Sequence, residues 1–156
     1  MKEIRLTQGK VALVDDADFD WLNQWKWSYA KRGYAVRTVG NKHVTMHRQI
    51  MQAQPGQIVD HKETGVPDHA LNNQRENLRI CNSSQNGANS KLGKNNTSGY
   101  KGVCWAKGKR KWMSKITKNR KTIFIGYFSD PIDAAKAYDL TAQKLFGLFA
   151  NTNFPI

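Results

Sequence analysis

The sequence is poor in cysteine and has no long apolar run, and these two shortages narrow the class of protein. Cys81 and Cys104 are its two cysteines, and they form no CxxC pair. They are too few for a disulfide framework, so we expect a reducing, intracellular setting in the cytoplasm. A zinc site built from them and the histidines matches no finger spacing. No apolar run approaches the roughly 20 residues of a membrane-spanning helix, and no signal-peptide pattern follows Met1, so no membrane partner is expected.

Acidic residues are also scarce, and their shortage is concentrated in one half of the chain. Residues 1–76 hold 11 Lys/Arg against 9 Asp/Glu, whereas residues 77–156 hold 14 against 3. From Asn77 through Ser129 there is no acidic residue at all. A basic segment of that length favours a polyanionic partner, and nucleic acid is the expected one. A basic surface that serves only solubility is the alternative.

A chain of 156 residues can form one domain or two small ones. The segment that begins at Lys91 is polar, contains glycine and has no hydrophobic period, which is typical of a linker. We therefore expect an α+β protein with an N-terminal module over residues 1–90, a linker over 91–97 and a C-terminal domain over 98–156.

The C-terminal domain is predicted to be a three-stranded antiparallel sheet packed on one helix. Basic turns join three runs of strand-forming residues, Tyr100–Trp105, Lys111–Ile116 and Lys121–Tyr127. After Asp130-Pro131, apolar residues recur at spacings of three and four, which indicates an amphipathic helix. The helix should cover one face of the sheet, and the free face should carry Lys, Arg and Trp.

The N-terminal module is predicted to begin with short strands and a small helix. An acidic run that starts at Asp15 and leads into Trp21-Leu22 predicts a short capped helix. The large aromatic side chains that follow, Trp25 and Trp27 among them, are expected to pack in the core rather than to stack on bases.

The middle of the chain is predicted to form a strand, a loop, a second strand and a helix. A short apolar strand ends at Asp60-His61, and a second strand covers Leu78–Ile80. The polar loop between them contains Gly65. The stretch Ser83–Asn86 then supplies an N-cap and the first turn of a helix.

This arrangement combines a divalent-metal site with a general base. Asp60 and Asn86 can supply oxygen ligands to one cation, and His61 can accept a proton near neutral pH. Hydrolysis of a phosphodiester needs a deprotonated water and a cation that holds the developing negative charge. The three residues therefore predict phosphodiester hydrolysis.

Four motif pieces carry a resemblance to a known family: Met46-His47-Arg48, Val59-Asp60-His61, Asn77-Leu78-Arg79-Ile80-Cys81 and Ser84-Gln85-Asn86. Through them, residues 5–90 resemble the HNH nucleases, in the phage and intron-encoded homing-endonuclease branch with a beta-beta-alpha metal fold. The resemblance implies that His61 is the general base and that Asp60 and Asn86 bind a single divalent metal. Mg²⁺ is the expected ion, with Mn²⁺ as an alternative.

Three further residues receive expected roles from the same resemblance. Asn77 corresponds to the asparagine that orders the loop of the hairpin. His47 and Arg48 are candidates for contacts to the phosphate or the scissile site, and packing beside the hairpin is the equal alternative.

The loop departs from the family pattern in two ways. It is longer than is common in this branch and contains a second pair, Asp68-His69. We expect His61 to be the base because it follows an apolar strand, whereas the second pair lies in a loop. Where the family usually has Asp-Asn in this loop, this sequence has Asn72-Asn73. The chain therefore lacks one carboxylate, and the expected role of that carboxylate is structural.

Residues 98–155 resemble a second family, on the pieces Ser98–Val103, Lys111-Trp112, Ile125–Phe128, Ala134–Asp139 and Phe154-Pro155. The family is the plant APETALA-two/ethylene-response-factor type of DNA-binding domain, which also occurs fused to HNH homing nucleases. Such a domain lays its sheet in the major groove. The implied DNA contacts are Lys101, Trp105, Lys107, Arg110, Trp112, Lys115, Lys118 and Arg120. Because lysine replaces arginine at several of these positions, relaxed base specificity is expected.

The sequence therefore predicts a metal-dependent endonuclease of the homing type that acts on double-stranded DNA. With one motif, a monomer or weak dimer would cut one strand at a time, and no small-molecule cofactor is implied. The resemblance also implies a phage or mobile-element origin in a bacterial host. A catalytically inactive, sequence-biased DNA-binding regulator is the alternative, and an RNA-directed protein is less favoured because a sheet does not enter an A-form major groove easily.

Overall fold

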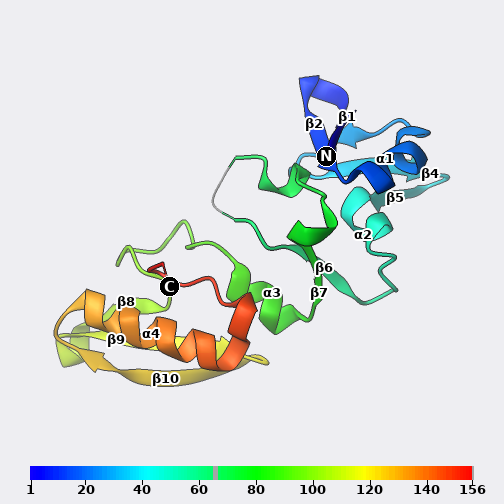
Figure 1. Cartoon of the computed structure of the whole chain (residues 1–156). Coiled ribbons are helices and arrows are strands. Elements are labelled where there is room, and N and C mark those ends of the chain that lie inside the picture. The colour runs from blue at the N-terminus through cyan, green and yellow to red at the C-terminus, as the bar shows by residue number, and fades with distance from the viewer. Residues whose placement is uncertain (65–66, 156) are drawn as a thin grey trace. The chain divides into compact units, whose positions relative to one another are not determined.

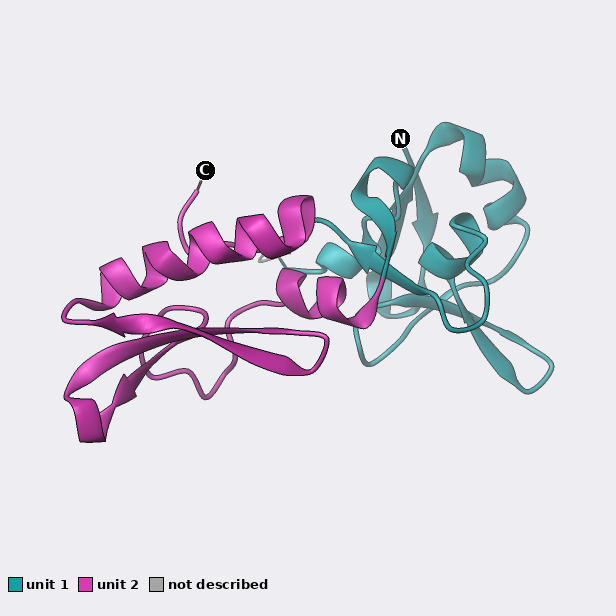
Figure 2. Cartoon of the chain, turned by 90° about the horizontal axis from the view of Figure 1, so that it is seen from below, with its two compact units in different colours: residues 1–81 teal, residues 82–156 magenta. Residues whose placement is uncertain are grey.

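A computed structural model describes residues 1–64 and 67–155, so Gly65 lies outside the described residues. The described chain is mixed α+β, with four small antiparallel sheets and four α-helices. It divides into two compact units, residues 1–81 and 82–156 (Figure 2), and each is described by itself. The boundary falls after Cys81, not in the expected linker. No helix in the described ranges is long and apolar enough to cross a membrane.

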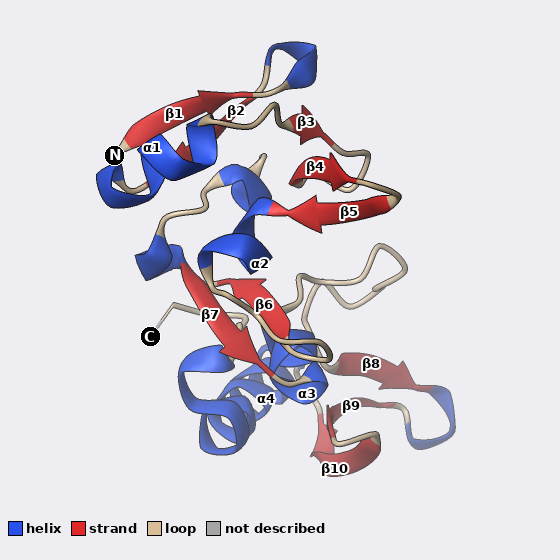
Figure 3. Cartoon of the chain, turned by 90° about the vertical axis from the view of Figure 1, so that its right-hand side faces the viewer, coloured by secondary structure: helices blue, strands red, loops and turns tan. Residues whose placement is uncertain are grey.

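The first unit is built from short elements, joined in three sheets. In chain order they are β1 (Lys2–Arg5), β2 (Val11–Val14), α1 (Asp16–Asn23), β3 (Ser28–Tyr29), β4 (Ala35–Val39), β5 (Lys42–Thr45), α2 (Met46–Ile50), β6 (Ile58–His61) and β7 (Leu78–Cys81), with 3-10 turns at Thr7–Gly9, His69–Leu71 and Arg75–Asn77. β1 pairs with β2, β4 lies between β3 and β5, and β6 pairs with β7 (Figure 3).

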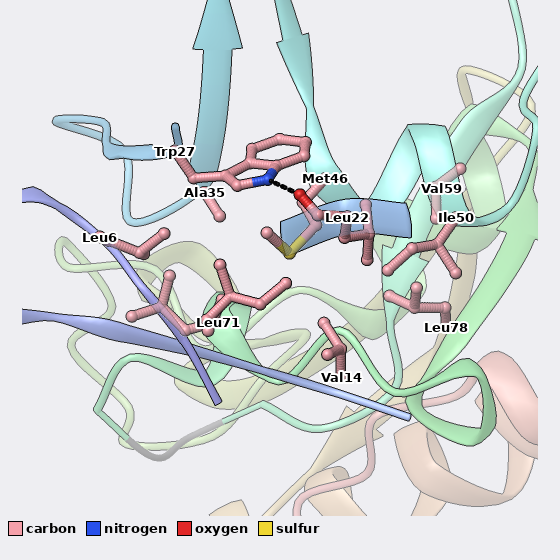
Figure 4. Packing of buried hydrophobic residues seen from close by; sticks show 12 residues of the cluster. Leu6, Val14, Leu22, Trp27, Ala35, Met46, Ile50, Val59, Leu71 and Leu78 are labelled. Carbon is pink, nitrogen blue, oxygen red and sulfur yellow. Dashed lines mark hydrogen bonds between the residues drawn. The ribbon is translucent and has the colours of Figure 1, made fainter. Parts of the chain in front are cut away.

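One apolar core joins these elements (Figure 4). Leu22 of α1 and Met46 of α2 are fully buried in it. Trp27 is buried too, and its indole Nε1 donates to the carbonyl of Leu22 at 2.9 Å, which satisfies the polar atom of a core tryptophan. Val59 of β6 and Leu78 of β7 belong to the same cluster. The strand that carries the predicted catalytic residues is therefore anchored in the core.

Helix α1 forms where the sequence predicts it, with Asp15 at the N-cap position, but the Asp15 side chain makes no capping hydrogen bond. The carboxylate of Asp15 instead accepts hydrogen bonds from Gln74 Nε2 at 3.3 Å and from the backbone N–H of Arg75 at 2.9 Å. The expected cap is wrong because a partner far along the chain binds the same carboxylate. No local pattern reveals such a partner.

The second unit contains the expected sheet and helix. Its elements are α3 (Ser83–Asn89), β8 (Val103–Ala106), β9 (Lys111–Lys118), β10 (Lys121–Phe128) and α4 (Pro131–Phe146), with 3-10 turns at Lys107–Lys109 and Gly147–Phe149. β9 lies between β8 and β10, and α4 runs across one face of this sheet (Figure 1). The three strands and the amphipathic helix are thus confirmed. Asp130 caps α4 by accepting from the backbone N–H of Ile132 at 2.6 Å.

Helix α3 follows the β6–β7 hairpin in sequence but belongs to the second unit. Its Ala88 lies in the buried cluster formed with Ile116 of β9 and Tyr138 of α4. The N-cap of α3 is Asn82, one residue before the predicted stretch Ser83–Asn86. Asn82 and Gln85 form a capping box, in which the side chain of each accepts from the backbone N–H of the other at 2.9 Å. The beta-beta-alpha metal arrangement therefore stays a prediction.

Gly102 occupies a place in the second unit that a larger residue cannot fill. Its φ is +76°, and a Cβ there would lie 2.0 Å from Tyr138 Cδ2 and 2.8 Å from the carbonyl oxygen of Lys115. We expect Gly102→Ala to destabilise the second unit by about 3 kcal/mol and to lower its melting temperature by more than about 10 °C. Gly108→Ala, where a Cβ meets nothing within 4 Å, is the matched control and should melt near the native temperature. Equal melting of both variants would contradict this packing.

Candidate active site and nucleic-acid surface

His61 lies at the end of β6 inside a cluster of aromatic rings. Its side chain is buried, and the ring of His47 from α2 lies 5.1 Å away, edge to face. Tyr34, just before β4, places its ring 5.0 Å from His47 and 6.0 Å from His61. The structure thus brings together two of the predicted catalytic residues, His61 and His47, and adds Tyr34.

Asn73 sets the orientation of the His61 imidazole. Asn73 is 1% exposed, and its Nδ2 donates to the carbonyl of Leu71 at 3.0 Å, which leaves Oδ1 facing His61 Nε2 at 3.4 Å. Because an amide oxygen only accepts, the proton sits on Nε2 and Nδ1 carries the lone pair. In this neutral tautomer of His61, Nδ1 is the proton acceptor.

Burial keeps both histidines neutral. It lowers the pKa of His61 below its ordinary 6.5, against the opposing effects of the Asn73 hydrogen bond and the Asp60 charge. Burial lowers the pKa of His47 to about 3, and the charges of His61 and Arg48 act in the same direction. Among the described side chains, His47 Nδ1 is buried without a hydrogen-bond partner. A neutral imidazole is the form that accepts a proton.

Asp60 precedes His61 and is held by an arginine of the neighbouring strand. Arg79, its register partner on β7, donates from Nε at 3.1 Å and from a terminal nitrogen at 3.0 Å to Asp60 Oδ2. A divalent metal would have to share this carboxylate with the guanidinium. The donor set still fits Mg²⁺, since that ion commonly takes one or two protein oxygens and completes its shell with water and phosphate.

Asn86, the second expected ligand, lies on α3 in the other unit. The described residues contain no group of three or more His, Cys, Asp or Glu side chains that could hold a metal. The predicted pair of one carboxylate and one amide oxygen stays a prediction.

Asn77 and Arg48 hold backbone segments in place. Asn77 Oδ1 accepts from the backbone N–H of Glu63 at 2.9 Å, and its Nδ2 donates to the carbonyl of Asn72 at 2.8 Å. These bonds tie the two ends of the loop together, as expected for a residue that orders it. The Arg48 guanidinium donates to the carbonyls of Gln57 and, at 3.1 Å, Gln54, which fixes the segment before β6.

The second Asp-His pair has a different environment. Asp68 forms an ion pair with Lys10 at 2.7 Å and accepts from the Tyr29 hydroxyl at 3.3 Å. The hydrogen bond from Lys10 holds the pKa of Asp68 below its ordinary value. Both Asp60 and Asp68 are ion-paired, so what favours Asp60-His61 as the catalytic pair is the buried place of His61 beside His47.

In the second unit, the tryptophans lie on the helix side of the sheet. Trp112 packs with Val103 of β8 and Ala134 of α4, and its ring is 5.2 Å from that of Trp105, its register partner. The expectation that tryptophan occupies the free face is wrong. The strand alternation places Trp112 on the same side as Ser114, which is fully buried.

Lys118 also departs from the prediction. It lies on the side of Trp112 and Ser114, and its Nζ donates to the carbonyl of Leu145 at 3.2 Å. The same nitrogen lies 5.8 Å from the centre of the Phe146 ring. Lys118 thus binds the last turn of α4 and is not on the free face.

The free face carries lysine and an exposed aromatic pair. Lys115 is exposed and lies opposite Phe124. The rings of Phe124 and Tyr127 are 4.9 Å apart, and these residues are 54% and 42% exposed. A bulge between Phe124 and Gly126 lets two aromatic residues three positions apart share this face.

The remaining basic candidates fall into two groups. Lys107, Arg110 and Arg120 are exposed in the two turns of the sheet. Lys101 is instead tied down, because its Nζ donates to the carbonyls of Ala88 and, at 2.6 Å, Ser90. Burial lowers the pKa of Lys101 to about 8.

Sequence reasoning missed three features. Asn73 was expected only to replace a structural residue, and Tyr34 carried no motif. The pair Phe124 and Tyr127 escaped because simple alternation puts residues three apart on opposite faces. For Asn73, the sequence shows only a polar residue in the loop before the second strand. Buried amides are usually hydrogen-bonded, so a partner could have been expected only if the burial of Asn73 had been predicted.

The chain is similar to several known proteins. It is 30% identical over 151 residues to an uncharacterised HNH endonuclease, L560, of Acanthamoeba polyphaga mimivirus, a match that covers 94% of this chain and 76% of that protein. It is 47% identical over 58 residues to the ethylene-responsive transcription factor ERF024 of Arabidopsis thaliana, covering 36% of this chain and 32% of that protein. Protein 3.8 of Escherichia phage T7 is 34% identical over 80 residues, covering 48% and 63%. No protein-family model and no solved structure matches.

The burial of His47 predicts a loss of stability in acid. Its folded pKa of about 3 lies below the ordinary 6.5, so the unfolded chain binds the proton more readily between these values. Stability should therefore fall as the pH drops from 6.5 toward 3, by up to about 1.4 kcal/mol per pH unit for one histidine. Urea unfolding at pH 7 and pH 5 checks this.

His47→Gln should lose part of that pH dependence, whereas His43→Gln, at an exposed histidine, should retain it. The same loss of stability between pH 7 and pH 5 in all three proteins would contradict the prediction.

Proposed function

Because the chain belongs to the HNH endonuclease family, we propose that it is a metal-dependent endonuclease of double-stranded DNA. The observation that carries the proposal is the buried His61, which Asn73 holds with Nδ1 as the proton acceptor. The basic second unit supplies the expected grip on DNA, in keeping with its partial similarity to a plant transcription factor. The Lys and Arg side chains of its turns suit phosphate contacts, and the lysine and the aromatic pair of its free face suit phosphate and base contacts.

In the proposed reaction, His61 Nδ1 takes the proton of a water that attacks phosphorus, while the bond to the leaving oxygen breaks. The low pKa of His61 keeps this nitrogen unprotonated at neutral pH. Asp60 and Asn86 would hold the metal, whose chemistry is to stabilise the negative charge that develops on the phosphate oxygens. His47 and Tyr34 confine the imidazole, and Asn77 keeps the loop in place.

One catalytic motif gives one cut for each binding event. We therefore expect the monomer to nick DNA at a preferred site, as a homing-type enzyme with Mg²⁺, and two molecules to be needed for a double-strand break.

One observation favours a second function. Arg79 donates two hydrogen bonds to Oδ2 of Asp60, the side chain that the metal would also need. If this ion pair keeps Mg²⁺ from the Asp60 carboxylate, the protein is a DNA-binding regulator without nuclease activity. Binding of duplex DNA without any cleavage would support that function.

The first test is cleavage of supercoiled plasmid. With Mg²⁺ we expect open-circular product from the native chain, and His61→Ala should slow its formation by at least about 100-fold through loss of the base. His69→Ala, which changes the histidine of the other Asp-His pair, is the matched control and should cut at the native rate. Native-like nicking by the His61 variant would reject His61 as the base, and nicking in excess chelator would reject the metal.

A second test separates the two sides of the sheet. Lys115→Gln, on the free face, should weaken duplex binding about fivefold and reduce the slope of log affinity against log salt by about 1. Lys118→Gln removes the same charge but only a contact to α4, so it should lower thermal stability and leave the salt slope unchanged. Both variants are titrated with duplex DNA at several salt concentrations. If Lys118→Gln reduced the salt slope and Lys115→Gln did not, DNA would bind on the helix side of the sheet.

A further inference from the structure

A groove in the first unit lies over β4, β5 and α2 and has a volume of about 480 Å³. Its polar lining consists of Arg37, His43, Thr45, Arg48, Gln49 and Gln52. We propose that this groove binds backbone phosphates of the DNA strand beside the His61–His47 cluster. The proposal rests on the proposed function, because it takes DNA as the substrate.

The charge of the surrounding segment suits a phosphate and not a cation. Residues 21–59 contain six Lys/Arg and no Asp or Glu, although residues 1–76 as a whole are nearly balanced. The acids of the first unit occur only before and after this segment, so the groove has no carboxylate in its lining. Positive charge gathered at a concave surface raises the local positive potential, which attracts an anion such as phosphate.

Arg37 is fixed in a geometry that suits anion binding. Its guanidinium carbon lies 3.9 Å from the centre of the Trp25 ring, and its Nε donates to Gln49 Oε1 at 2.9 Å. Stacking and one hydrogen bond hold the guanidinium plane, so little side-chain entropy is lost when a ligand binds. No hydrogen bond of its two terminal nitrogens is seen within the described residues, and these donors suit phosphate oxygens.

One residue, Thr45, links the groove with the candidate active site. Thr45 lines the groove, and its hydroxyl lies 3.4 Å from His47 Nε2. The His47 ring is 5.1 Å from that of His61. A strand bound along β5 and the start of α2 therefore passes beside the imidazole pair, and flanking phosphates held in the groove would position the phosphate to be cleaved.

Gln52 allows a test that preserves the fold. It is exposed at the groove, and Gln52→Glu keeps its size while adding a negative charge. Asn23→Asp makes the same amide-to-acid change at an exposed position on α1 and is the matched control. The probe is a labelled duplex oligonucleotide, and the full-length chain is titrated in chelator so that no cleavage intervenes.

We expect Gln52→Glu to weaken binding about fivefold and Asn23→Asp to leave it within about twofold of native. Arg37→Gln should reduce the salt slope by about 1, with its folding checked by a thermal melt. If Gln52→Glu bound the duplex with native affinity, the proposal that the groove binds phosphates would be rejected. If the native chain binds no duplex DNA, the proposed function itself fails, so the two failures are distinct.

Discussion

The ion pair between Asp18 and Arg75 ties the candidate site to the rest of the first unit. Two bonds of 2.7 and 2.8 Å join the Arg75 guanidinium to both carboxylate oxygens of Asp18, whose side chain is 3% exposed. Asp15 binds the backbone of Arg75, and the backbone N–H of Asn73 donates to Leu13 at 2.8 Å. Loss of Arg75 would be destabilising, because the buried Asp18 carboxylate would be left without its ion-pair partner. The orientation of His61 therefore depends on acidic residues more than 40 positions earlier in the chain.

This dependence explains which features the sequence could predict. The strands and helix of the second unit follow from local alternation and period, and Asp60-His61 ends a strand as its apolar lead-in predicts. The partners of Asp15 and Asn73 lie tens of residues away, so no local pattern reveals them. The prediction of which side chains lie on each face of the second unit's sheet was wrong for a similar reason. The bulge after Phe124 changes the alternation, and the C-terminal turn of α4 offers Lys118 a carbonyl that only the folded chain provides.

Internal pairing of carboxylates also shapes the outer charge. Asp18 and Asp60 face arginines, and Asp68 faces Lys10. Asp139 of α4 is buried and accepts backbone N–H bonds from Asn153 and Phe154 at 2.8 and 3.0 Å, which fixes the C-terminal segment. These acids stabilise contacts within the protein and contribute little repulsion toward an anion. The lysines and arginines of the turns, the free face and the groove then dominate the field that a nucleic acid meets.

The short helix α3 shows why truncation cannot separate cutting from binding. Its seven residues are too few to form a stable helix alone, and its last carbonyls are bound by Lys101 and Asn151 of the second unit. Ser84 accepts from the backbone N–H of Asn119 at 2.7 Å, so the β9–β10 turn holds the other end. Removal of residues 91–156 would leave α3 without these contacts, and Asn86 would lose its support. A truncated chain that fails to cut would therefore not show that the second unit only binds DNA, whereas point substitutions on the sheet leave α3 intact and can separate the two roles.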